Sequence, residues 1–195
     1  MKKKIALLMA VVMLFGMTVA GTLAWLQAKS NPVVNTFTVG KIEIDLNETD
    51  VDNDSSTKAN TYKVVPGNKY VKDPVVTVKA GSEPCYVFVE IVEEGNTFDT
   101  DDKYIQFEIN TDDWTLVTGE TNVYYYKNVV DASTANVVMT STVLKTVNGN
   151  NITINPAITE SDMTAATAAK ITFNAYAVQS ANLDNANAAW TASGF

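Results

Sequence analysis

Short apolar runs alternate with turn-forming residues along this chain, and that spacing limits its fold more than any other feature. The runs are rich in Val, Ile, Thr and aromatic residues, and Gly, Pro, Asn and Asp separate them. Alternation is clearest in Ile42–Leu46 and Ile171–Tyr176, where every second side chain can face a core. Such runs between turn signals are typical of a β-sandwich.

We therefore predict an all-β, jelly-roll-like sandwich with short helical segments, formed by one domain over residues 40–195. The predicted strands are Thr36–Leu46, Tyr62–Val65, Val75–Lys79, Cys85–Glu93, Ile105–Ile109, Thr115–Val117, Asn122–Lys127, Val137–Val147, Ile152–Ile154 and Lys170–Gln179. Pro66-Gly67 predicts a type II turn, and Asn148-Gly149 predicts a hairpin between residues 143–147 and 152–154. Helices are predicted from a Ser161-Asp162 cap through Ala169, and from Asp184 or Asn185 through Ala192.

The N-terminus has the pattern of an export signal. Three lysines, Lys2 to Lys4, precede an uncharged stretch from Ile5 to Ala28 that ends in small residues. This pattern predicts a signal helix over residues 1–24, cut between Ala24 and Trp25, with Ala20 as the second choice of cleavage site. The stretch is also long enough to span a bilayer, so a retained membrane anchor is the alternative.

The charged residues exclude several classes of function. There is no His, no Arg and one Cys, so the usual nucleophilic triads, zinc helices and arginine clamps have no side chains to build them. Cleavage after residue 24 removes three of the 14 lysines and none of the 22 acids, which lowers the formal charge from -8 to -11. The mature chain is thus expected to bind neither nucleic acid nor, directly, the membrane surface. We predict that it is not an enzyme and holds no cofactor.

Several segments together resemble a known family. These are Gly21–Leu26, Asn35–Gly40 and Ile42–Leu46, and further Val65–Asn68, Lys72–Pro74, Cys85–Val89, Phe173–Gln179 and Ala188–Trp190. They are similar to the TasA and camelysin (CalY) family of exported Gram-positive proteins, whose signals are processed by the dedicated signal peptidase SipW. The resemblance implies a secreted jelly-roll sandwich that assembles into extracellular biofilm-matrix fibres. Residues 93–165 carry no matching motif.

The resemblance also implies how subunits join, because in such fibres the freed N-terminal segment of one subunit can complete the sheet of the next. An open sheet edge has unpaired N–H and C=O groups, which an added strand satisfies while its alternate side chains fill pockets. The expected partners are therefore further copies of the chain, besides the signal peptidase during export. The candidate donor is residues 25–39, with apolar contacts from Trp25, Leu26, Val33, Val34 and Phe37. Alternatively this segment pairs within its own domain or is a free tail.

Camelysins have been described as metallopeptidases, but the residues of this chain argue against that activity. Without His, and with one thiol, only carboxylates remain as ligands, and these suit hard cations rather than catalytic zinc. The acidic loop Asp50–Ser55 resembles a Ca²⁺ loop, yet Ser55 stands where Gly is needed and Thr61 where a bidentate Glu is needed. Such acidic loops could hold Ca²⁺ weakly, as could those with Asp99, Asp101 and Asp102 and with Asp112-Asp113, but we do not predict it.

Two further features favour packing over chemistry. Cys85 opens an apolar strand, where a free thiol behaves as a small hydrophobe. Tyr124-Tyr125-Tyr126 fits a strand with Tyr125 on the opposite face from its neighbours. The alternative to a fibre subunit is a monomeric cell-surface binding module that uses the tyrosines or acidic loops as its contact surface.

Overall fold

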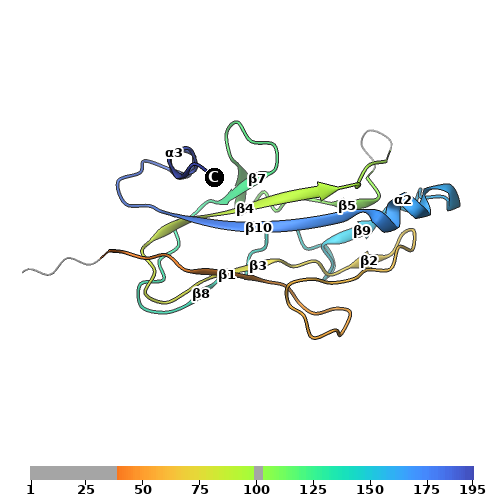
Figure 1. Cartoon of the computed structure of the whole chain (residues 1–195), viewed down its shortest axis with the longest axis horizontal. Coiled ribbons are helices and arrows are strands. Elements are labelled where there is room, and N and C mark those ends of the chain that lie inside the picture. The colour runs from red at the N-terminus through yellow and green to blue at the C-terminus, as the bar shows by residue number, and fades with distance from the viewer. Residues whose placement is uncertain (1–38, 99–102) are drawn as a thin grey trace, which may run out of the picture. The chain divides into compact units, whose positions relative to one another are not determined.

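The computed structural model describes residues 39–98 and 103–195, and Figure 1 shows their arrangement. The chain divides into two compact units, 1–38 and 39–195, of which the second contains every described residue. The predicted signal helix, the cleavage site and the donor residues Trp25 to Phe37 lie outside the described residues. Among the helices that are described, none is long and apolar enough to span a bilayer.

The described strands are β1 (Ile44–Asn47), β2 (Lys69–Tyr70), β3 (Val75–Val78), β4 (Cys85–Glu94), β5 (Ile105–Phe107), β6 (Trp114–Leu116), β7 (Val123–Tyr126), β8 (Val137–Val138), β9 (Ile152–Ile154) and β10 (Lys170–Gln179). A 3-10 turn, Glu160–Asp162, leads into helix α2 (Met163–Ala168), and helix α3 (Ala186–Ser193) lies near the C-terminus. All strand pairs are antiparallel.

Three sheets enclose one main core. They have the orders β10-β4-β7-β6, β1-β3-β8 and β2-β9-β5. The longest pairing joins β4 to β10 along the whole of both strands, and Figure 1 shows this pair lying over β1 and β3. The predicted all-β sandwich with short helical segments is confirmed.

Side-chain alternation along β4 explains how its sheet divides two apolar layers. Cys85, Val87, Val89 and Ile91 belong to the main core and are at most 4% exposed. The intervening Phe88 points to the opposite face, where it packs in a second cluster. Because successive strand residues point to opposite faces, one strand can serve both layers.

Helix α3 covers the second face. Its Trp190 ring lies 5.1 Å from the Phe88 ring between centroids, and the Trp190 indole N–H donates to Glu120 at 3.0 Å. Asn185 caps the helix by accepting from the Ala188 N–H at 3.0 Å, as expected from the sequence. The helix ends at Gly194, whose φ of +72° is a left-handed conformation that suits glycine.

Three predicted strands are much shorter or absent, and in each a side chain bonds a backbone group of the segment. In the described part of Thr36–Leu46, the Glu43 N–H donates to the Ser82 hydroxyl, and β1 begins only at Ile44. Residues 62–65 form no strand, and the Tyr70 hydroxyl donates a hydrogen bond to the Lys63 carbonyl. Within 137–147 only β8 is a strand, and the Thr142 hydroxyl takes the Leu144 carbonyl. Such side-chain bonds to the backbone compete with sheet formation.

The turns and the first helix need one correction each. Gly67 (φ +82°) and Asn148-Gly149 (φ +52° and +79°) adopt the predicted turn conformations. However, β9 pairs with β2 and β5 rather than with residues 143–147, so the predicted hairpin partner was wrong. Asp162 stands at the N-cap of α2, as predicted, but its side chain makes no capping bond to that helix. It accepts instead from the N–H of Thr159, the N-cap of the preceding 3-10 turn.

Candidate functional site: an apolar groove between two sheet edges

Two strands that border the main core end their sheets. β1 pairs with β3 and β10 pairs with β4, and neither has a second partner strand among the described residues. Their inward side chains are only partly buried, whereas those of β4 between β10 and β7 are fully buried. The core is therefore open along the line where β1 and β10 face each other.

A groove of about 860 Å³ occupies this opening. Its apolar lining comes from strands on both sides, namely Ile44 and Leu46 of β1, Ile171, Phe173 and Ala175 of β10, and Ile152 and Ile154 of β9. The loop after β1 forms one wall and α2 closes one end through Ala166 and Thr167. A groove with this lining can receive a chain whose side chains alternate between apolar and solvent-facing.

The two edges differ in how far their backbone is already satisfied. The Lys58 ammonium donates to the Leu46 carbonyl at 2.6 Å, and the Glu48 N–H donates to the Thr57 carbonyl at 2.9 Å. The loop after β1 thus occupies that strand's outer edge. Lys58 also donates to Asp45 and holds the pKa of this carboxyl well below its usual range, with help from Asn47.

The edge of β10 is free in comparison. Ser180 donates its N–H to the Pro84 carbonyl, which fixes the even-numbered residues of β10 as those bonded to β4. The N–H and C=O groups of the odd-numbered residues, from Ile171 to Gln179, therefore point to the open side. No strand of the described chain pairs with them. This row is the longest unpaired backbone edge beside the groove.

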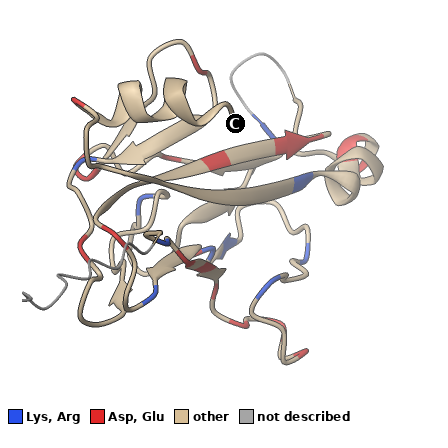
Figure 2. Cartoon of the chain, turned by 60° about the vertical axis from the view of Figure 1, so that its left-hand side comes forward, with Lys and Arg blue, Asp and Glu red and all other residues tan. Residues whose placement is uncertain are grey.

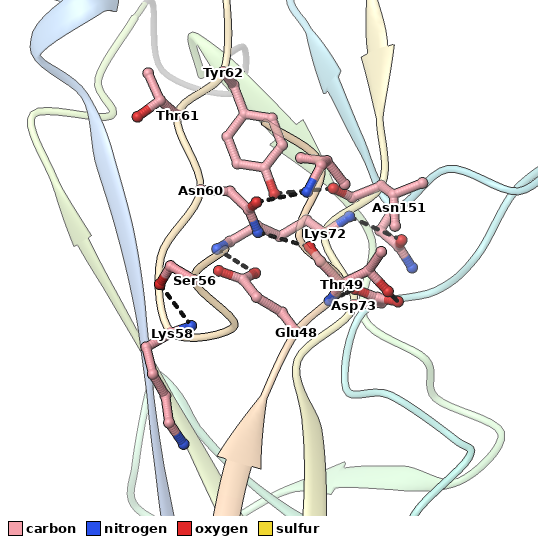
Figure 3. A network of polar contacts seen from close by, with 12 residues as sticks. Glu48, Thr49, Ser56, Lys58, Asn60, Thr61, Tyr62, Lys72, Asp73 and Asn151 are labelled. Carbon is pink, nitrogen blue, oxygen red and sulfur yellow. Dashed lines mark hydrogen bonds and ion pairs between the residues drawn. The ribbon is translucent and has the colours of Figure 1, made fainter. Parts of the chain in front are cut away.

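A buried ion pair interrupts the apolar lining. The Lys72 ammonium lies 2.7 Å from a Glu48 carboxylate oxygen, and these side chains are only 10% and 8% exposed. Lys72 Nζ also lies 5.3 Å from the ring centre of Phe173 and 5.7 Å from that of Tyr62, close enough for cation–π attraction. Figure 3 shows Glu48 and Lys72 directed toward each other below the Tyr62 ring.

Neighbouring hydrogen bonds fix the position of this pair. The Lys72 N–H donates to the Asn151 side-chain oxygen at 3.1 Å, and the Tyr62 hydroxyl donates to the Val71 carbonyl at 2.9 Å. Burial raises the pKa of Tyr62, and the negative charges of Glu48 and Asp73 raise it further. Sequence reasoning missed the ion pair, because nothing in the order of residues distinguishes Lys72 from a solvated lysine.

The acidic loop resembles a self-capped turn more than a cation site. Asp50, Asp52 and Asp54 can bring one oxygen each to within 4.8 Å of the others. Yet Asp50 accepts from the N–H groups of Asn53 and Ser55, and Asp52 and Asp54 also accept backbone N–H bonds. Bonds to backbone lower the pKa of Asp52, led by the Thr61 N–H. Asp54 is exposed, whereas Asp50 and Asp52 are partly buried. Figure 2 shows that acidic residues are spread over several loops of the fold.

The remaining sequence-predicted residues lie apart from the groove. Tyr124 and Tyr126 pack on the main core and Tyr125 on the other face, as predicted, so the three rings form no single platform. Asp113 accepts from the Ser141 hydroxyl, and Asp99, Asp101 and Asp102 lie outside the described residues.

The Cys85 thiol is expected to be unreactive in the folded protein. Its thiol is free and buried, and burial raises the pKa of the Cys85 thiol to about 11. The thiolate is the reactive species, and both the raised pKa and the burial of Cys85 reduce its reaction. At pH 8 we expect a thiol reagent to modify less than about a tenth of the native chain in the time that it modifies all of the urea-unfolded chain. Rapid modification of native protein would contradict this placement.

Comparison with known proteins adds no relative. A scan against protein-family models, a search of curated proteins and a search of solved structures each found no match.

Proposed function

We propose that this protein is a secreted structural subunit of the TasA-like class, which self-assembles into extracellular matrix fibres by strand addition. The observation that carries the proposal is the free edge of β10 above an open apolar groove. A long edge of this kind is normally blunted or covered, because it invites pairing with another chain. Here an added strand would bury the partly exposed lining and satisfy the backbone groups of β10.

The occupant we propose is the N-terminal segment of a second copy, residues 25–39. The described chain enters at Val39, which is 97% exposed, and continues to Lys41, whose carbonyl accepts from the Glu83 N–H. The first residue of the groove lining is Ile44, and residues 39–43 precede it in the described chain. To reach the groove of its own chain, the N-terminal segment would have to turn back before Val39 and run alongside these five residues. A second copy needs no reversal. Fully extended, 15 residues span about 50 Å, enough for a strand along β10.

Nothing in the proposal requires catalysis. The one thiol is buried with a raised pKa, and no histidine is available as a base or metal ligand. The groove offers a bound strand the backbone groups of a sheet edge, apolar side chains and one ion pair. Secretion and release of the donor by signal cleavage belong to the same proposal and are motivated by the position of Trp25 next to the predicted cut.

Deletion of the donor segment tests the proposal. We expect the chain of residues 25–195 to form fibres in a concentration-dependent manner, and the chain of residues 40–195 to stay monomeric, by size-exclusion chromatography and electron microscopy. Addition of a peptide of residues 25–39 should restore a strand to the groove of the shorter chain without restoring growth. Fibres formed by the shorter chain alone would overturn strand donation, and a monomeric 25–195 chain that binds a glycan or protein would favour a binding module.

A further inference from the structure

The buried ammonium beside the groove has unused hydrogen-bonding capacity. An ammonium group has three N–H donors, and Glu48 is the one acceptor that Lys72 Nζ bonds within the described part of the chain. Its other near neighbours are the Tyr62 and Phe173 rings, which attract the charge without accepting a conventional hydrogen bond. A buried charge with unsatisfied donors is costly, so an acceptor supplied by a groove occupant would be strongly favoured.

The proposed donor segment carries a side chain suited to this position. Pro32 has no N–H to donate, and proline is common at the first position of a strand, so the paired part of the added strand is expected to begin after it, at Val33. From there Val33, Asn35 and Phe37 share one face, and Val34, Thr36 and Thr38 share the other. The first set reads apolar, polar, apolar. The groove likewise has one ion pair among apolar side chains.

A carboxamide matches an ion pair better than other uncharged groups. Its oxygen can accept from an ammonium while its NH₂ group donates to a carboxylate. We propose that the Lys72–Glu48 pair is the register determinant of the groove, and that it binds the Asn35 side chain of a second copy of this chain. This inference rests on the proposed function and adds a specific contact to it.

The consequence of such a contact is a single register. A slip by one residue would turn Phe37 out of the groove and present Val34 or Thr36 to the ion pair. Val34 has no hydrogen-bonding side chain, and the Thr36 hydroxyl must accept and donate through one oxygen, whereas the Asn35 carboxamide has a separate acceptor and two N–H donors. A buried polar group of this kind selects one alignment among several that apolar contacts alone would permit.

Reciprocal substitutions in the chain of residues 25–195 test the contact, with the critical concentration for fibre formation measured by sedimentation. N35L should raise that concentration at least about tenfold, because the charged pair then lacks its partner. The double substitution K72M/E48L should have a similar effect, since Asn35 then enters an apolar groove. Combining all three substitutions should return the value to within about threefold of wild type, because apolar faces apolar. N31L, before Pro32, is the matched control and should have no effect.

The possible results distinguish a failure of the Asn35 contact from a failure of the proposed strand donation. Fibres of N35L at the wild-type concentration would overturn the inference while leaving strand donation intact, as would a triple variant no better than K72M/E48L. A wild-type chain without fibres would instead overturn the proposed function, and the register determinant with it. A loss of folding cannot imitate the expected result, because N35L would not rescue an unfolded K72M/E48L chain.

Discussion

Replacing Ala175 with proline should abolish fibre growth while the chain stays folded. The Ala175 N–H lies on the side of β10 away from β4, so proline there removes no bond of the existing sheet. The incoming strand, however, would lose a donor and meet the pyrrolidine ring. An unpaired buried carbonyl costs about 1–3 kcal/mol, before the steric clash is counted. Sedimentation and electron microscopy measure the loss of fibres, and circular dichroism measures the retained fold.

Leu116 provides the matched control, since it lies on the opposite edge strand of the same sheet. The Val117 N–H bonds the Val123 carbonyl, so the neighbouring Leu116 N–H points away from β7. L116P therefore makes the same backbone change at an edge outside the groove and should leave fibre growth intact. If L116P stops growth and A175P does not, the acceptor edge is β6, and the assignment of β10 is wrong.

The sequence predicted those strands whose pairing depends only on side-chain alternation. β9 and β10 have the predicted bounds, and β3 and β4 differ by one residue at one end. It failed where a polar side chain bonds the backbone, and such a bond is hardest to foresee across a long separation. The Ser82 hydroxyl that takes the Glu43 N–H comes from a loop 39 residues away, and no local pattern reports such a contact.

The groove was unpredictable for a related reason. Its two edges come from β1 and β10, at opposite ends of the described chain, and only the tertiary arrangement leaves both without a second partner strand among the described residues. The sequence could indicate a donor, because apolar residues after the predicted cut are visible in one dimension. The acceptor edge, by contrast, depends on which strand ends a sheet, and this is known only from the order of strands in the fold. Lys72 likewise becomes distinctive only when folding surrounds it with Tyr62 and Phe173.

Removing one member of the buried ion pair should be among the most destabilising changes in the core. In K72M the Glu48 carboxylate stays buried, 8% exposed, without its counter-charge. Breaking a buried pair in this way typically lowers the free energy of unfolding by about 3–5 kcal/mol. Urea unfolding of the full chain, below the concentration at which fibres form, measures the effect at neutral pH.

Two controls decide whether the pair serves stability or recognition. K145M removes the lysine of an exposed pair, 52% and 68% exposed, and should scarcely change the urea midpoint. The double substitution K72M/E48L removes both buried charges, and replacement of a whole pair by apolar groups is often neutral or stabilising. If the double variant is at least as stable as wild type, the pair is costly or neutral to the fold, and its presence needs a functional reason such as selection of an incoming strand. If the double variant is as unstable as K72M, the pair holds the two layers together at this edge, and stability alone explains it.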